Sequence, residues 1–210
     1  MYKKAAHHAI DFINNDLDGY PYSEVRLFEI PYYQDSFNAF ANSIAISEKE
    51  GWYADTDGMK ERAYIFQSTA SQMIKHWLQS KANIANVQGG NMLSKALPEA
   101  LALQLLKEKL GKDALAHIIQ RKKDFYGKEK NNEANTEPPL LYADGIEYLE
   151  ENKGVIVFHE IIEHIGDKSF IKLLNRYLKE YHNKNISFEG FYTQLKPLLS
   201  SALIQKIEKV

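Results

Sequence analysis

The sequence contains no cysteine. Disulfide bonds and thiolate metal sites are therefore excluded, although the compartment stays open because many exported bacterial domains also lack cysteine. No apolar run approaches the roughly 18 residues that indicate a membrane-spanning helix. The first residues, MYKKAAHHAIDF, do not form a signal peptide, because His and Asp interrupt an apolar stretch that is already too short. We expect the chain as given to be soluble.

A large excess of charge of one sign is also missing. Lys and Arg number 26 against 28 Asp and Glu, which gives a formal net charge of −2. The basic run Arg121–Lys123 is short and Asp124 follows it, so the run is typical of a solvated helix end. This composition predicts no nucleic-acid partner.

The chain does contain enough apolar sequence for one sizeable core, because 44% of its 210 residues are hydrophobic. We predict a single domain over residues 1–210, mainly α with a small β element. Apolar residues recur three or four apart in most segments and alternate in short ones. Helices are predicted at Lys3–Asp16, Glu61–Ser80, Met92–Leu110, Lys112–Tyr126, Leu140–Asn152, Val155–Gly166, Asp167–His182 and Ser187–Ile207, strands at Glu24–Ile30 and Ser43–Ser47, and an exposed loop at Gly127–Pro139.

The most informative stretch is Ser71–Glu99, which reads SQMIKHWLQSKANIANVQGGNMLSKALPE. It starts inside one predicted helix, crosses a loop rich in Asn, Gln and Gly, and enters the next helix. The layout resembles the zinc core of the aminopeptidase N-like (gluzincin) metallopeptidases, most closely the forms fused to bacterial ABC-transporter permeases. Those proteins have HExxH-Q-W-W on the first helix, which Trp77 matches, then a loop and a second helix that opens like Met92-Leu93-Ser94. The resemblance implies a thermolysin-like, mainly helical catalytic-domain fold.

In this register the residues that would bind zinc are changed. Ser71 and Lys75 lie at the positions of the two zinc histidines, and Lys95 lies at that of the third ligand, a glutamate. Gln72 lies at the position of the general-base glutamate and has no basic carboxylate that could take a proton from water. Zinc requires neutral or anionic donors in a near-tetrahedral array, so two ammonium groups among its ligands would repel it. The family would use zinc as its cofactor, whereas for this chain we expect none.

A fifth position of the family differs as well. The resemblance places a tyrosine in a Tyr-x-Lys-Gly pattern, where its hydroxyl contacts the tetrahedral intermediate. Here Lys153-Gly154 is present, but Glu151 takes the place of the tyrosine. A carboxylate cannot donate a hydrogen bond to an oxyanion at neutral pH. Tyr148, one helical turn earlier, matches a different tyrosine of the family. We therefore expect no catalytic residue at any of the five positions.

Two histidine patterns offer alternatives. Moving the register by one residue places His76 and Gln72 on the zinc positions, but it leaves Met73 as the base and gives up the match at Trp77, so we reject it. The segment HEIIEH at His159–His164 is neither HExxH nor HxxEH. Its histidines lie roughly 140° apart around a helix, at about 100° per residue. This segment is more typical of an exposed charged face than of a metal site.

The changed positions suggest a different use of the old site. If the fold is kept, Lys75 and Lys95 should converge with Glu151 as a Lys–Glu–Lys cluster that replaces the charge of the ion. Such a cluster requires pairing or water, because an unpaired buried ammonium group is costly. The alternative is that each lysine extends to solvent. Together with Glu99 and Tyr148, these three residues are our candidates for a remnant binding cleft.

The sequence therefore predicts a catalytically inactive metallopeptidase-like domain that binds or scaffolds a peptide or protein. Because the resemblance covers only a catalytic-type domain, it implies a fragment of a longer bacterial protein. Association with the membrane, at the extracytoplasmic face of the cell envelope and with a transporter, would then come from parts outside this chain. One alternative is an active zinc peptidase whose relocated site uses Glu99, Glu151, His76 or the His159–His164 helix. Another is a purely structural module whose cleft is filled by side chains.

Overall fold

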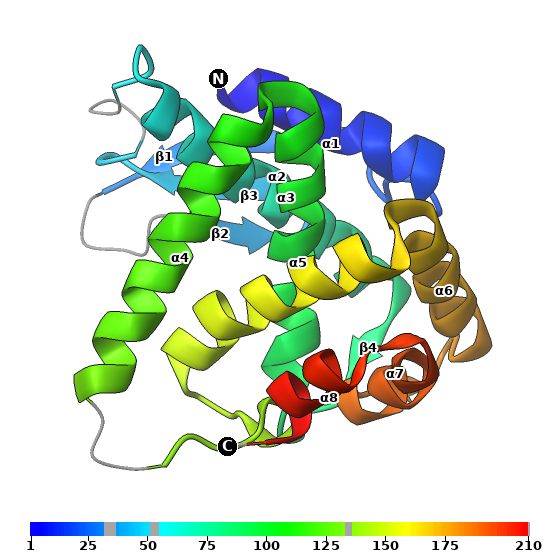
Figure 1. The fold of residues 1–210 in the computed structure, drawn as a ribbon. Helices are drawn as coiled ribbons and strands as arrows, with labels where there is room; N and C mark the ends of the chain where they lie inside the picture. The colour runs from blue at the N-terminus through cyan, green and yellow to red at the C-terminus, as the bar shows by residue number, and fades with distance from the viewer. Residues whose placement is uncertain (32–36, 51–54, 133–135, 210) are drawn as a thin grey trace. The chain divides into compact units, whose positions relative to one another are not determined.

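The computed structural model describes residues 1–31, 37–50, 55–132 and 136–209. The chain forms two compact units, Met1–Ser80 with Leu101–Ile118 and Lys81–Ala100 with Ile119–Val210. The helices α3 (Leu97–Leu110) and α4 (Lys112–Asn132) each contribute residues to both units. Figure 1 shows the elements of both units along the chain.

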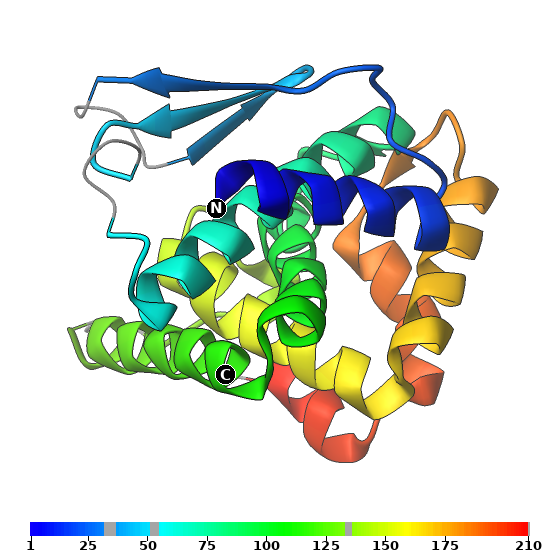
Figure 2. The same ribbon diagram turned by 90° about the horizontal axis from the view of Figure 1, so that it is seen from above.

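The first unit contains a small sheet beside two long helices. Its strands are β1 (Arg26–Ile30), β2 (Phe37–Phe40) and β3 (Ser43–Ser47), in the order β1-β3-β2. β1 runs parallel to β3, whereas β2 runs antiparallel to it. The Ser-Ile-Ala-Ile-Ser sequence of β3 places Ile44 and Ile46 on one face, where both are buried. Phe37 lies opposite Ile46, and its ring contacts that of Tyr2 in α1 (Tyr2–Asp16), which runs along the sheet (Figure 2).

The central helix of this unit is α2 (Met59–Lys81). It is buried on most sides, which its sequence allows because small residues such as Ala63 and Ala70 alternate with large apolar ones. Trp77 and Phe66 are almost fully buried. α1 contributes Ala5 and other small residues to the same core, so backbones can approach closely there.

The second unit consists of short and medium helices. They are η1 (Met92–Ala96), η2 (Leu140–Tyr142), η3 (Leu149–Lys153), α5 (Gly154–Ile165), α6 (Asp167–Glu180), α7 (Phe188–Leu195), η4 (Lys196–Leu198) and α8 (Ser201–Glu208). η1 and η3 are π-helical turns, and each runs directly into an α-helix. The two-residue strands β4 (Asn83–Ile84) and β5 (Asn185–Ile186) pair in parallel.

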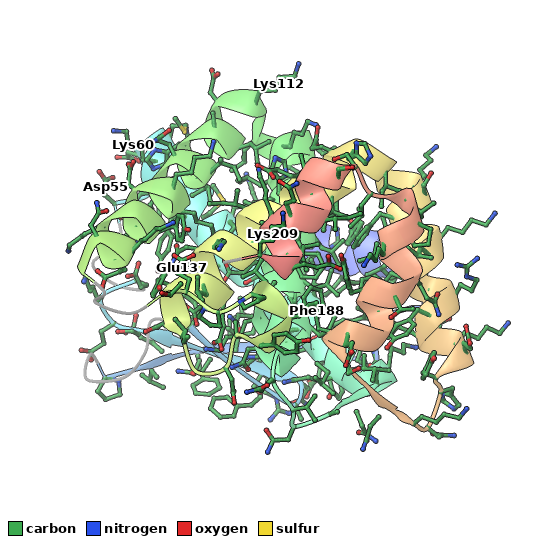
Figure 3. The ribbon with its side chains drawn as sticks, turned by 60° about the horizontal axis from the view of Figure 1, so that its bottom comes forward. Asp55, Lys60, Lys112, Glu137, Phe188 and Lys209 are labelled. Atoms are coloured by element: carbon green, nitrogen blue, oxygen red, sulfur yellow. The ribbon has the colours of Figure 1, made fainter. Side chains whose placement is uncertain are left out.

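Aromatic rings form much of the core around α6 and α7. The ring of Phe191 lies 6.0 Å from that of Phe170 and 5.1 Å from that of Tyr177. Phe188, labelled in Figure 3 at the start of α7, lies 5.6 Å from the ring of Phe158. Ser187 is the N-cap of α7, and its side chain accepts a hydrogen bond from the Gly190 backbone N–H. This is the favoured chemistry of a helix start.

The predicted fold class, mainly α with a small β element, is confirmed. The predicted strands Glu24–Ile30 and Ser43–Ser47 correspond to β1 and β3. The prediction of a single domain over residues 1–210 stays a prediction. None of the helices in the described ranges combines the length and the apolar character that crossing a membrane requires.

Four predicted boundaries are wrong. α4 continues through Gly127 to Asn132, so the first part of the predicted loop Gly127–Pro139 is helical, while residues 133–135 lie outside the described residues. The predicted break at Lys153-Gly154 is absent, because η3 passes directly into α5. Within the predicted helix Leu140–Asn152, only η2 and the residues from Glu147 onward are helical. Pro197 lacks a backbone N–H, and the predicted helix Ser187–Ile207 is divided there into α7 and α8.

Candidate functional site

Three of the predicted site residues lie on α2 in the first unit. Ser71 and Lys75 are one helical turn apart on the same side of the helix. The Ser71 hydroxyl is buried and donates to the backbone oxygen of Ser68 at 3.0 Å, so the helix itself satisfies it. Oε1 of Gln72 is buried and accepts no hydrogen bond from the residues that the structure describes. Neither side chain offers zinc an anionic or imidazole donor.

His76, which we rejected as a zinc ligand, has a structural environment of its own. It is 1% exposed. Its Nε2 lies 3.0 Å from the backbone oxygen of Ser43, and its Nδ1 lies 3.0 Å from the Tyr20 hydroxyl. A carbonyl oxygen only accepts, so Nε2 bears the proton and Nδ1 accepts from Tyr20. Burial lowers the pKa of His76, which keeps the ring neutral. The imidazole therefore ties α2 to β3.

The predicted site residues of the second unit meet at the two π-helical turns. The ammonium group of Lys95, on η1, lies 3.1 Å from Oε1 of Glu151 on η3. It also lies 3.2 Å from Oε2 of Glu150. The side chains of Lys95 and Glu151 are each 35% exposed, whereas that of Glu150 is fully buried. One ammonium group thus serves two adjacent carboxylates.

The other oxygen of Glu150 holds two further segments. Oε1 accepts a hydrogen bond from the Asn91 side-chain amide at 2.8 Å and one from the Gly145 backbone N–H at 2.7 Å. Asn91 precedes η1, and its Oδ1 accepts from the Ser94 hydroxyl at 3.2 Å. Oε1 is therefore satisfied by two donors, whereas Oε2 accepts no hydrogen bond from the described residues and faces the ammonium group of Lys95. We call Asn91, Lys95, Gly145, Glu150 and Glu151 the Lys95 cluster.

A second lysine joins α4 to the same place. Lys122 is largely buried, and its ammonium group donates to Oε2 of Glu99 and, at 2.7 Å, to the backbone oxygen of Glu151. The expectation that Arg121–Lys123 is a solvated helix end is therefore wrong for its middle residue. The local sequence does not indicate this pairing, because Glu99 and Glu151 are remote from Lys122 in the sequence.

Burial and neighbouring charge act on the cluster in opposite directions. Burial alone would lower the pKa of Lys95, but the carboxylates of Glu151 and Glu150 outweigh it and raise that pKa. Burial raises the pKa of Glu151, Lys95 opposes this, and the nearby carboxylates of Glu99 and Glu147 add to the rise. The ammonium form of Lys95 is thus strongly favoured, while the charge of Glu151 is only partly compensated.

Tyr148, the remaining cleft candidate, belongs to a neighbouring cluster. It is 8% exposed, and its ring stacks on that of Tyr126 with 6.0 Å between centroids. The Tyr126 hydroxyl donates to Oε2 of Glu137 at 3.1 Å, and Lys153 donates to the same oxygen at 2.7 Å. Figure 3 labels Glu137, which is 6% exposed. These contacts join α4, the segment before η2 and the end of η3.

The residues that the resemblance places at the zinc positions do not fit the ion. Within the described ranges, no three or more His, Asp or Glu side chains form a group that could hold a metal. Where the resemblance places the third ligand, Lys95 offers an ammonium group that already binds two carboxylates. His159 and His164 lie on α5 as predicted, five residues apart, and His164 is exposed. The ammonium group of Lys95 has three N–H donors and no free electron pair, so it cannot coordinate a metal.

The structure thus brings together part of the predicted cluster. Lys95 and Glu151 form an ion pair, and Glu99 is linked to Glu151 through Lys122. Lys75 lies in the first unit and has interactions of its own, so its place in a Lys–Glu–Lys cluster stays a prediction. That these residues border a cleft also stays a prediction.

Sequence reasoning missed Glu150 and Asn91. The family pattern directed attention to Glu151 alone, and Asn91 was interpreted only as part of a loop. The signal available was the adjacent pair Glu150-Glu151 within a helical segment that is otherwise apolar at Tyr148 and Leu149. A charged residue that is itself buried needs a partner, and Lys95 was one of two lysines at the zinc positions of the same motif.

Comparison with known proteins gives a likeness of fold alone. No family model matches the sequence, and no curated protein matches it. Among solved structures, an M1 zinc metallopeptidase from Deinococcus radiodurans aligns over 98% of this chain with a TM-score of 0.69 and 15% identity. A mutant of that organism's enzyme with a bound Tyr-Ser-Ala substrate aligns over 97% with a TM-score of 0.64 and 15% identity.

A two-domain M1 zinc metallopeptidase mutant bound to L-arginine aligns over 97% of this chain, with a TM-score of 0.63 and 16% identity. In all three comparisons the aligned region is 42% of the other chain, so this chain spans less than half the length of the enzymes that it matches. The chain is similar in fold to a part of the M1 zinc metallopeptidases, the aminopeptidase N family.

Proposed function

We propose that this chain is an M1-peptidase-like domain without zinc catalysis, and that it works by binding or scaffolding a peptide or protein. The observation that supports the proposal most is the state of Lys95. At the position where the resemblance expects a glutamate ligand, a lysine forms ion pairs with Glu150 and Glu151. Its ammonium group repels a divalent cation and cannot donate an electron pair to one.

The chemistry on α2 points in the same direction. The register places Ser71 and Lys75 at two ligand positions and Gln72 at the general base. A hydroxyl that donates within its own helix, an ammonium group and an amide supply neither zinc ligands nor a base. Binding makes lower demands than catalysis, because it requires a shaped surface but no activated water.

A peptide is the ligand class that the fold likeness favours. One matched M1 enzyme is described with a bound Tyr-Ser-Ala substrate, and another with L-arginine. For this chain we propose a peptide or a protein segment as the partner. We further propose a setting at the extracytoplasmic face of a bacterial membrane, within a longer, transporter-associated protein. The fraction of the M1 enzymes that the chain spans, 42%, is consistent with a fragment.

The test combines metal analysis with two functional assays on the purified protein. We expect zinc well below one ion per chain after preparation in zinc-containing medium, and no release of amino acids from Tyr-Ser-Ala. Binding of Tyr-Ser-Ala, followed by calorimetry or by NMR shifts, should persist with a chelator present. The outcome that overturns the proposal is stoichiometric zinc with peptide turnover that a chelator abolishes, which would establish an active peptidase with a relocated site.

A purely structural module is distinguished by the binding arm of the same test. It would show neither zinc nor turnover, and it would also fail to bind Tyr-Ser-Ala or other short peptides. The matched control is Glu163→Gln on α5, an exposed position away from the Lys95 cluster. Peptide binding that weakens in Glu151→Gln but not in this control would locate the ligand near η3.

A further inference from the structure

We infer that Lys95 is an internal cation on which the stability of the second unit depends. Its ammonium group neutralises the buried Glu150 and thereby holds η1, η3 and the Gly145 segment in place. The inference rests on the proposed function in one respect, the expectation that the second unit needs no metal. The structural role of Lys95 is tested by measuring stability, so a failure of this inference is distinguishable from a failure of the proposed function.

The first step of the argument concerns Glu150. Its side chain is fully buried, so its charge loses nearly all contact with water. Oε1 accepts two hydrogen bonds, from Asn91 at 2.8 Å and from Gly145 at 2.7 Å. Oε2 accepts no hydrogen bond from the described residues, and the cation that it faces is the ammonium group of Lys95, 3.2 Å away. Without that ammonium group the carboxylate would be a buried, uncompensated charge.

The second step concerns what these contacts join. Lys95 comes from η1 and Glu150 from η3, and the two turns pack against each other. A Cβ built on Gly154, which begins α5, would lie 2.8 Å from Cε of Met92 in η1. The two π-helical turns are thus in close contact on either side of the Lys95–Glu150 pair. A coordinated metal holds its ligands' segments together in the same manner, through one central positive charge.

The third step concerns why the carboxylates of Glu150 and Glu151 hold the ammonium group of Lys95 and not a divalent metal ion. Glu151 provides Lys95 with a second carboxylate at 3.1 Å, so the ammonium group is held from two sides. A lysine fixed in this way excludes a divalent ion from the carboxylates by charge and by space. The protein should therefore fold and keep its stability without metal, unlike a domain whose folding energy comes from coordination.

The experiment compares unfolding temperatures of the full chain and three variants. Lys95→Met keeps most of the length of the side chain but removes the charge, and we expect its unfolding temperature to fall by about 10 °C. The matched control is Lys206→Met, which removes an exposed ion pair with Glu160 and should lower the temperature by no more than about 2 °C. An unfolding temperature of Lys95→Met within that control range overturns the inference.

The double variant Lys95→Met/Glu150→Gln separates charge from packing. Its glutamine oxygen still accepts from Asn91 and Gly145, but no buried charge remains, so we expect at least half of the lost temperature to return. This arm also covers the case in which Lys95→Met fails to fold, because the double variant should then fold. A double variant no more stable than the single one contradicts the inference. A chelator should leave the wild-type unfolding temperature unchanged, and a fall of several degrees would overturn it as well.

Discussion

His76 shows how a single residue next to an apparent metal motif acquires a structural role. Ser43 accepts from its Nε2 and Tyr20 donates to its Nδ1, each across 3.0 Å. These two partners suit a neutral ring, and burial lowers the pKa of His76 below its usual 6.5. A protonated ring would need Tyr20 to accept instead of donate, so the contact between α2 and β3 should weaken in acid.

This pairing predicts a pH dependence of stability. With the folded pKa below the unfolded one, the unfolded state binds more protons in the window between them, so stability is lost as pH falls through 6.5 toward the lowered value. The slope in this window should reach up to about 1.4 kcal/mol per pH unit. In His76→Gln this contribution should vanish, and urea unfolding from pH 7.5 to 5 measures the difference. A constant difference between wild type and variant across the range contradicts this account.

Glu150 illustrates the limit of sequence reasoning at the residue scale. The positions Ser71, Gln72, Lys75, Lys95 and Glu151 were found because each matches a position in a known pattern. Glu150 matches none, and its importance comes from complete burial and from Asn91, 59 positions away in the sequence. Burial of a polar residue depends on the elements that pack over it, which the local pattern does not specify. Lys122 was misjudged for the same reason.

At the scale of elements, two glycines in helices have opposite environments. Gly127 lies inside α4, and a Cβ there would meet nothing within 4 Å. Gly154 begins α5, and a Cβ there would lie 2.8 Å from Cε of Met92 and 3.0 Å from the backbone oxygen of Leu149. The first glycine therefore only weakens its helix, whereas the second permits η1 and α5 to approach each other.

Gly127→Ala should stabilise the protein by about 0.5–1 kcal/mol, because alanine restricts the unfolded chain and fits the helix without a clash. Chemical denaturation measures the change as a shift of the midpoint at constant slope. Destabilisation by this substitution would show that α4 does not continue as a regular helix through Gly127.

Gly154→Ala should have the opposite sign and destabilise by about 1–2 kcal/mol, since Met92 and the turn around Leu149 must both shift. Gly127→Ala, the same substitution in open space, is its matched control in the same denaturation assay. Equal effects of the two substitutions would contradict the close approach of η1 and α5.

A helix or strand could be predicted from the sequence where its own residues determine it, and not where contacts with a remote segment do. α1, α2, β1 and β3 were predicted near their observed bounds, because their apolar period is set by their own residues. The passage of η3 into α5 was missed, since Lys153-Gly154 is typical of a turn when read alone. The two-residue strands β4 and β5 were missed as well, because each exists only through pairing with the other.

At the scale of the whole molecule, the fold and the chemistry of the chain differ in how far they agree with the M1 enzymes. The fold agrees over 97–98% of the chain at TM-scores of 0.63–0.69. In the register that the resemblance gives, we propose that the residues at the positions of zinc and of the base differ in donor type from those of the family. Fold is fixed by many apolar contacts and tolerates such exchanges, whereas a metal site depends on a few donors.

Neither the stability nor the secondary structure of the chain should therefore depend on zinc. We expect the same unfolding midpoint and the same far-UV circular dichroism for protein prepared with excess zinc and for protein stripped with a chelator. A metal that binds only the native state would raise the midpoint by mass action. A zinc-dependent rise of several degrees that saturates at one ion per chain would contradict the proposed absence of a zinc site.

The most direct measurement is anomalous X-ray scattering at the zinc edge from crystals grown with excess zinc. We predict no anomalous peak within coordination distance of Glu99, Glu150 or Glu151. The electron density should also show the ammonium group of Lys95 between the carboxylates of Glu150 and Glu151. A zinc peak bound to Glu150 or Glu151, with the ammonium group of Lys95 turned away, would contradict the account at its centre.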